Sequence, residues 1–168
     1  MILNKLFYPK SVAVVGASDR PGSFGYHAAI NAMKSAELRV YLVNPKRKEL
    51  MGCRVYASLE DLPEAADCAV ICTPKEAVLP ILRQAAEMGT KAAVVYASGF
   101  SEEHSDDGAA MENDMEQLAQ EYGMAILGPN CAGLLNNVNK INLWGMNCQL
   151  DMQTRPTGIG VLAQSGFI

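Results

Sequence analysis

Short apolar runs alternate with amphipathic stretches along this chain. Five apolar runs, several of them rich in β-branched residues, predict buried strands at 11–15, 40–43, 68–72, 92–96 and 124–127. Between them, apolar residues recur every three or four positions, which predicts helices at about 24–36, 76–88 and 111–122, the last two ending at Gly89 and Gly123. Strands separated by helices predict an α/β fold, namely a Rossmann-like doubly wound parallel sheet of five or more strands with helices on both faces.

The pattern also divides the chain into three parts. Residues 1–136 carry the alternating strands and helices and predict one nucleotide-binding domain. Residues 137–157 lose the periodicity and are rich in Asn, Gln, Thr and Pro, which predicts a linker or an extended crossover. Residues 158–168 run from an apolar stretch into Gln164-Ser165-Gly166, so we expect the first strand of a second domain that the sequence leaves incomplete.

Composition narrows the range of partners. Hydrophobic residues make up 49% of the 168 positions and charged residues 19%, which is ordinary for an α/β domain. A net charge of −4 disfavours nucleic acid as a partner. The sequence has neither an apolar run near the roughly 20 residues of a membrane span nor a signal peptide, so we expect a cytoplasmic protein. Its five cysteines lack metal-ligand spacing and predict reduced core thiols and no metal site.

Turn residues follow each predicted strand, at the edge of the sheet where ligands bind in such folds. The turn after the first strand is a glycine loop that leads into a helix, where backbone N–H groups can hold a phosphate. It departs from the dinucleotide pattern G-x-G-x-x-G because Ser18 occupies the place of the second glycine. The predicted turns are 16–25, 44–48, 73–74, 97–100 and 128–130.

The turn after the second strand carries three consecutive cations. NAD-binding domains usually place an acidic residue there for the ribose hydroxyls, whereas this chain has Asn44 followed by Lys46, Arg47 and Lys48. Such cations fit an extra phosphate on the ribose, either the 2′-phosphate of NADP or the 3′-phosphate of coenzyme A. A solvated loop of charges is the alternative.

Four segments occur in the order seen in one known family: 12–22, 43–45, 98–102 and 128–133. With them the chain resembles the CoA-binding domain of NDP-forming acyl-CoA synthetases, which include ADP-forming acetyl-CoA synthetase and the α subunit of succinyl-CoA synthetase. The resemblance covers nearly the whole chain. Its most specific element is the Gly-Pro-Asn-Cys-Ala-Gly segment at 128–133, which a dehydrogenase has no reason to carry.

The resemblance implies coenzyme A as the cofactor and assigns parts of its site. The loop around Ser18 would wrap the CoA phosphates, although Asp19 and Arg20 replace smaller residues of the succinyl-CoA synthetase loop. Arg47 would lie near the nucleotide, and Asn130 with Cys131 would face the thioester end. The full set of expected binding residues is Gly16, Ala17, Ser18, Asp19, Arg20, Pro21, Gly22, Asn44, Pro45, Lys46, Arg47, Thr73, Pro74, Ser98, Gly99, Phe100, Asn130 and Cys131.

The resemblance also implies a reaction: an acid, CoA and ATP give acyl-CoA, ADP and phosphate through an acyl phosphate and a phosphohistidine. Neither His27 nor His104 matches the family's catalytic position, so we expect no catalytic residue here and no turnover by this chain alone. The expected partners are CoA, a carboxylic acid or acyl-CoA, and further synthetase domains or a subunit with the phosphohistidine and an ATP-grasp fold. An unpaired strand edge would also allow a homo-oligomer.

Two other functions stay open from the residues. The first is a stand-alone module that binds or senses CoA, which would not need the 128–133 segment or Gln164-Ser165-Gly166. The second is a fragment of an NADP-dependent oxidoreductase, which the cations at 46–48 permit and the missing second glycine disfavours.

Overall fold

A computed structural model describes residues 3–148 together with residues 158, 160, 161 and 163. Most of the strand expected at 158–168, including Gln164-Ser165-Gly166, lies outside the described residues.

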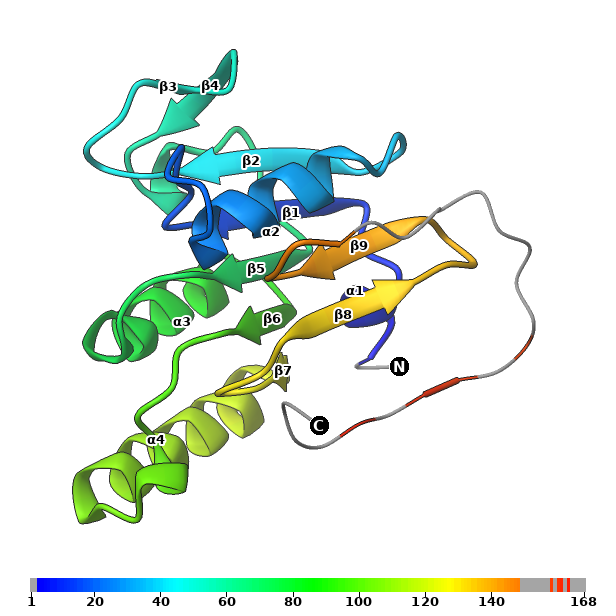
Figure 1. Cartoon of the computed structure of the whole chain (residues 1–168). Helices are drawn as coiled ribbons and strands as arrows, with labels where there is room; N and C mark the ends of the chain where they lie inside the picture. The colour runs from blue at the N-terminus through cyan, green and yellow to red at the C-terminus, as the bar shows by residue number, and fades with distance from the viewer. Residues whose placement is uncertain (1–2, 149–157, 159, 162, 164–168) are drawn as a thin grey trace.

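A mostly parallel sheet of seven strands forms the centre of the protein, in the order β3-β4-β2-β1-β5-β6-β7 (Figure 1). Only β3 runs antiparallel to its neighbour. The six parallel strands have the strand order of a Rossmann fold, with the reversal between β1 and β5. This arrangement confirms the predicted fold class. The strands are β1 (Ser11–Val15), β2 (Arg39–Val43), β3 (Glu49–Leu50), β4 (Cys53–Tyr56), β5 (Cys68–Ile71), β6 (Ala92–Val95) and β7 (Ala125–Leu127).

Successive residues of the central strands enter two separate cores, one on each face of the sheet. Val12 and Val14 of β1 belong to one core, whereas Ala13 and Val15 belong to the other. Both sets are buried, which explains why these strands read as continuous apolar runs. The first face is covered by α1 (Asn4–Phe7), α2 (Phe24–Met33) and a β-hairpin, and the second by α3 (Val78–Glu87) and α4 (Asp106–Tyr122).

The hairpin on the first face consists of β8 (Gly133–Asn136) and β9 (Ile141–Trp144). It lies beside α2 in front of the sheet, in orange and yellow in Figure 1. Asn31 of α2 donates hydrogen bonds to the carbonyls of Trp144 and Met146, at 2.8 and 2.9 Å. Residues 141–144 thus form a strand inside the linker or extended crossover expected at 137–157, of which residues 149–157 lie outside the described residues. The strand has only four residues, too few to stand out from the polar residues around them.

Serine and glycine residues form caps at the ends of α2 and α4. Ser23 caps α2 by accepting a hydrogen bond from the amide of Tyr26 at 3.2 Å, and Ser105 caps α4 in the same way. Gly123 ends α4 in the left-handed conformation. No helix among the described residues is both long and apolar enough to cross a membrane.

Candidate functional site

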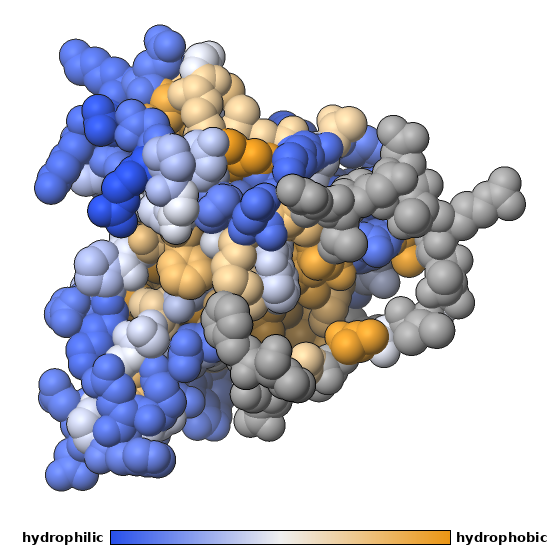
Figure 2. Space-filling view, in the orientation of Figure 1, coloured by the Kyte–Doolittle hydropathy of each residue, from blue (hydrophilic) through white to orange (hydrophobic). Residues whose placement is uncertain are grey.

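The turns that follow the parallel strands gather at one edge of the sheet. They follow β1, β2, β5, β6 and β7, and the reversal of strand order between β1 and β5 lies in their middle. In Figure 2 this edge is on the left, where hydrophilic side chains over β3, β4 and α4 flank a more apolar band. A crevice at such a reversal is the usual ligand site of an open α/β sheet.

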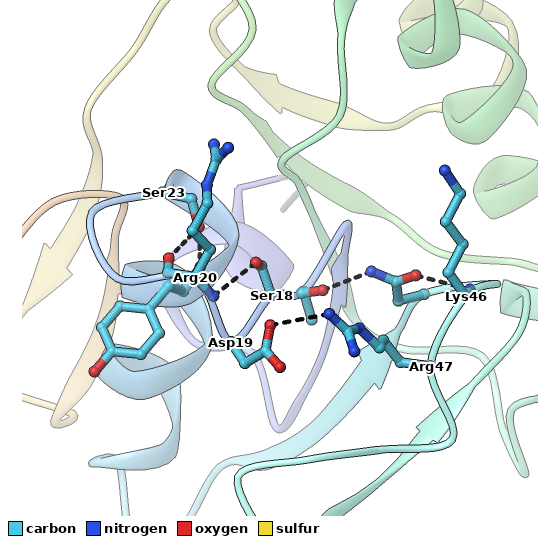
Figure 3. A network of polar contacts seen from close by, with 9 residues as sticks. Ser18, Asp19, Arg20, Ser23, Lys46 and Arg47 are labelled. Atoms are coloured by element: carbon cyan, nitrogen blue, oxygen red, sulfur yellow. Dashed lines mark hydrogen bonds and ion pairs between the residues drawn. The ribbon is translucent and has the colours of Figure 1, made fainter.

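Hydrogen bonds hold the turns after β1 and β2 against each other. The amide of Gly16 donates to the carbonyl of Val43 at 2.9 Å, and the Nδ2 of Asn44 donates to the carbonyl of Ala17 at 2.8 Å. Within the first turn the amide of Arg20 donates to the Oγ of Ser18 at 3.0 Å (Figure 3). Ser18 thus closes the loop on itself at the position where a dinucleotide-binding loop has its second glycine.

Helix α2 begins unusually close to this loop because of Gly25. A Cβ atom at Gly25 would lie 2.1 Å from the carbonyl oxygen of Gly16. Gly16 itself has a positive φ of 85°, which turns the chain out of β1. The N-terminus of α2 is therefore held directly beneath the turn, where its dipole favours an anion.

The cations after β2 lie at the outer side of this loop. The Nη2 of Arg47 is 3.3 Å from the Oδ1 of Asp19, and both side chains are about half exposed. Lys46 donates its backbone amide to the Oδ1 of Asn44 at 2.9 Å, while its side chain extends away from the network (Figure 3). Lys48 is exposed as well. Arg47 thus bridges the two turns, and the lysines leave two more positive charges beside it.

Two cavities open on this edge and share Cys72, Thr73 and Pro74. The first, here called the β2-side cavity, has a volume of about 500 Å³ and is lined by Val15, Gly16, Val43, Asn44, Pro45, Lys46, Ala57, Ser58, Leu59, Ala77, Ile81 and Gln84 besides the shared residues. The second, here called the β6-side cavity, has a volume of about 420 Å³ and is lined by Phe24, Lys75, Glu76, Tyr96, Ala97, Ser98, Gly99 and Glu103 besides the shared residues.

Thr73 lies where the two cavities meet and has an unpaired hydroxyl. Its Oγ1 is buried and has no hydrogen-bond partner among the described residues. Because a buried polar group without a partner costs free energy, a residue that lines both cavities and has an unpaired hydroxyl is suited to a ligand that spans them.

The structure brings most of the expected binding residues to this edge, but only eight of the eighteen line one of the two cavities: Gly16, Asn44, Pro45, Lys46, Thr73, Pro74, Ser98 and Gly99. The side chain of Phe100 is fully buried in the core on the α3 and α4 face, so it cannot contact a ligand. The backbone amides of Gly99 and Phe100 are occupied by the carboxylate of Glu102, at 2.6 and 3.0 Å. Ala17 is also buried and takes part through its carbonyl.

Asn130 and Cys131 line neither cavity. The amide of Asn130 donates to the carbonyl of Ala97 at 2.8 Å, which ties the turn after β7 to the turn after β6. The thiol of Cys131 donates to the carbonyl of Val95 at 3.3 Å, and burial raises its pKa. Such a thiol is a poor nucleophile, so it packs in the structure rather than reacts.

Seven residues that line the β6-side cavity were not among those expected from the sequence: Phe24, Cys72, Lys75, Glu76, Tyr96, Ala97 and Glu103. Lys75 donates to the carbonyl of Gly99 at 3.0 Å and lies 3.8 Å from Glu103. Phe24, Lys75 and Tyr96 each lie within or directly beside a predicted turn, which was the available signal. Among the described residues, no group of three or more His, Cys, Asp or Glu side chains is placed to hold a metal ion.

The sequence matches the family described as CoA binding domain over residues 10–137. Since this match covers well over half of the chain, the protein belongs to the CoA-binding domain family.

Similarities to individual proteins support the same family. The chain is 42% identical to a trans-feruloyl-CoA synthase from an unknown prokaryotic organism, over 99% of this chain and 24% of that protein. It is 36% identical to the ADP-forming acetate–CoA ligase II of Archaeoglobus fulgidus, over 98% of this chain and 24% of that protein. Among solved structures, the dinucleotide forming acetyl-coenzyme A synthetase 1 of Ca. Korarchaeum cryptofilum, in complex with phosphate and ADP, is 36% identical with a TM-score of 0.79, covering 86% of this chain and 31% of that one.

These matches confirm the resemblance to NDP-forming acyl-CoA synthetases and, with it, coenzyme A as the cofactor. The chain spans about a quarter of the length of the two curated relatives. It resembles the CoA-binding part of these enzymes.

Proposed function

We propose that this chain holds coenzyme A along the carboxyl edge of its sheet, with the nucleotide half in the β2-side cavity and the pantetheine arm in the β6-side cavity. The observation that carries the proposal is the junction at Thr73, where two cavities meet around a buried hydroxyl that has no partner among the described residues. Coenzyme A is a long ligand with a polar diphosphate in its middle, and such a group can accept the hydrogen bond that Thr73 has to offer.

Charge decides which half of the ligand occupies which cavity. Lys46 lines the β2-side cavity, and Arg47 and Lys48 follow it in the same turn. The 3′-phosphate of coenzyme A is attached to the ribose of the adenosine half, so this half belongs beside the cations. The diphosphate then passes the loop at 16–22 and the N-terminus of α2, and the uncharged pantetheine arm continues along Ser98 and Gly99.

We further propose that the chain serves an ADP-forming acid–CoA ligase, in which the CoA thiol attacks the carbonyl carbon of an acyl phosphate and phosphate leaves as the thioester forms. The phosphohistidine would come from another domain or subunit, because His27 lies on α2 and His104 ends the short 3-10 helix Ser101–Glu103, neither in a cavity wall. This chain alone would bind CoA without turning it over. The names of the two relatives give different acyl groups, feruloyl in one and acetate in the other. They therefore do not identify the acid that this chain would serve.

Binding of NADP is the competing proposal, since its 2′-phosphate would also suit the cations. It is disfavoured by Ser18, whose side chain occupies the loop where the pyrophosphate-binding pattern has a glycine.

The proposal is tested by giving the protein the two halves of the ligand separately. In amide NMR spectra, 3′,5′-ADP is expected to shift residues 44, 46–48 and 58, while pantetheine is expected to shift residues 75 and 97–99. Thr73 should respond to the nucleotide half and to whole CoA. The proposal is contradicted if the two halves shift the same residues, or if 3′,5′-ADP shifts 97–99 and leaves 44 and 46–48 unchanged.

A further inference from the structure

An aromatic pair forms part of the wall of the β6-side cavity. Phe24 and Tyr96 stack with their ring centroids 5.2 Å apart and their planes at 13°. Tyr96 is only 3% exposed, whereas Phe24 remains 44% exposed. One face of the Phe24 ring is therefore packed on Tyr96, and the rest of this large apolar side chain is available beside the cavity.

The hairpin β8–β9 and the segment after it hold the pair in place. The hydroxyl of Tyr96 donates to the carbonyl of Leu143 at 2.9 Å, which fixes the ring of Tyr96. Behind the pair lies Gly145, where a Cβ atom would be 2.7 Å from the Cδ1 of Phe24 and 3.0 Å from the Cε1 of Tyr96. Any larger residue at 145 would push the two rings, so the Phe24 ring is positioned by Tyr96 and by the segment 143–145.

The position of the ring along the ligand follows from the proposed orientation of coenzyme A, and the present inference rests on that orientation. The cations at 46–48 hold the adenosine end in the other cavity. The β6-side cavity then receives the opposite end of the ligand, which carries the thiol and, after reaction, the acyl group. Adenine, which is a planar group of CoA and could itself stack on an aromatic ring, is thereby placed away from Phe24.

We propose that Phe24 is a specificity-determining residue that selects a planar, aromatic acyl group on the thioester. An aromatic ring gains from stacking on another ring beyond the burial of its area, and the exposed face of Phe24 is already held in a fixed plane. An acetyl group covers too little of that ring to gain much from it. A saturated ring of the same carbon count buries a similar area but has no flat π face.

The test compares two CoA thioesters of nearly equal size, benzoyl-CoA and cyclohexanecarbonyl-CoA, with CoA as the reference. Calorimetric titration of the full chain is expected to give roughly fivefold tighter binding of benzoyl-CoA than of cyclohexanecarbonyl-CoA, which corresponds to about 1 kcal/mol. Phe24→Leu keeps an apolar side chain and should remove this preference, while Phe24→Tyr keeps the ring and should retain it. The preference is read within each variant as the ratio of its two thioester affinities, and circular dichroism with urea unfolding shows that both variants are folded.

The outcomes separate this inference from the proposed function. If the wild type binds CoA but shows no preference for benzoyl-CoA, the inference is overturned and CoA binding stands, and this comparison needs no variant. The inference is also overturned if Phe24→Leu keeps the preference, or if it weakens CoA as much as benzoyl-CoA, because the ring would then contact the common part of the ligand. If the wild type binds no CoA at all, the proposed function fails and this inference fails with it.

Discussion

Asp19 and Arg47 form an ion pair between the turns after β1 and β2, with 3.3 Å between the Oδ1 of Asp19 and the Nη2 of Arg47. Both side chains are about half exposed, so the pair is weak and can be exchanged for another partner. The arginine proposed to meet the 3′-phosphate is thus already balanced by a carboxylate, and that carboxylate must be displaced when CoA binds.

Replacing Asp19 with Asn should therefore strengthen CoA binding by roughly two- to fivefold, because Arg47 no longer has to leave an anionic partner. Calorimetric titrations at low and at high salt check this, and the gain should shrink as salt increases. Glu87→Gln, at the end of α3, makes the same change of charge away from the cavities and should leave the affinity unchanged. An equal gain from both variants would show that only the net charge matters.

Removing Arg47 should distinguish CoA from dephospho-CoA. Arg47→Ala is expected to weaken CoA by roughly tenfold and dephospho-CoA by less than threefold, since the lost charge-assisted hydrogen bond is made to the 3′-phosphate. Parallel titrations with the two ligands measure the difference. Equal losses would place Arg47 elsewhere along the ligand, for example at the diphosphate.

Thr73 allows a variant in which stability and binding change in opposite senses. Thr73→Val keeps the shape of the side chain and removes the buried hydroxyl, so the free energy of unfolding should stay the same or rise slightly. CoA affinity should fall by about fivefold because one hydrogen bond to the ligand is lost. Urea unfolding and titration of the same sample provide both values. A CoA affinity equal to that of the wild type would show that the hydroxyl does not contact the ligand.

The ionisation of Asp67 is expected to make the free energy of unfolding depend on pH. Although its partial burial opposes ionisation, hydrogen bonds from the side chain of Lys5 and the amide of Lys10 hold the pKa of Asp67 below its usual value. A lowered pKa in the folded state means that the carboxylate stabilises the protein above the unfolded pKa, and that this contribution is lost as pH falls through the folded value, below about pH 4.

Asp67→Asn should accordingly lower the free energy of unfolding by about 1 kcal/mol at pH 7, and the difference from wild type should narrow at pH 3. Urea unfolding at the two pH values measures it. Asp114→Asn, an exposed position on α4, is the matched control and should have no effect at either pH. A difference at Asp67 that stays constant with pH would contradict an electrostatic origin.

The fold was predictable because its central strands are buried on both faces and therefore read as apolar runs. Three of the strands that were not predicted lack that property, and the fourth, β9, is buried at residues 141–143 but has the polar Asn142 inside its run. β3 and β4 are short and partly exposed, and the residues of β8 are only half-buried. Their pairing depends on contacts with α2 and β2 that have no local periodicity in sequence.

The site was predictable as a set of turns, but not in the direction of each side chain. Phe100 follows a predicted strand and was expected to line the ligand, yet its side chain points into the core. Phe24 reads as the first apolar position of a helix, yet its ring remains half exposed because Gly145 and Tyr96 hold it on the cavity side. Both outcomes depend on packing between segments far apart in the chain.

We infer that this edge of the sheet binds coenzyme A in preference to dinucleotides. The most direct measurement is a parallel calorimetric titration of the chain with CoA, dephospho-CoA, NADP and NAD. We expect that CoA binds most tightly, that dephospho-CoA is weaker by about tenfold, and that the two dinucleotides are weaker still. Tighter binding of NADP than of CoA would contradict this claim and indicate an oxidoreductase fragment instead.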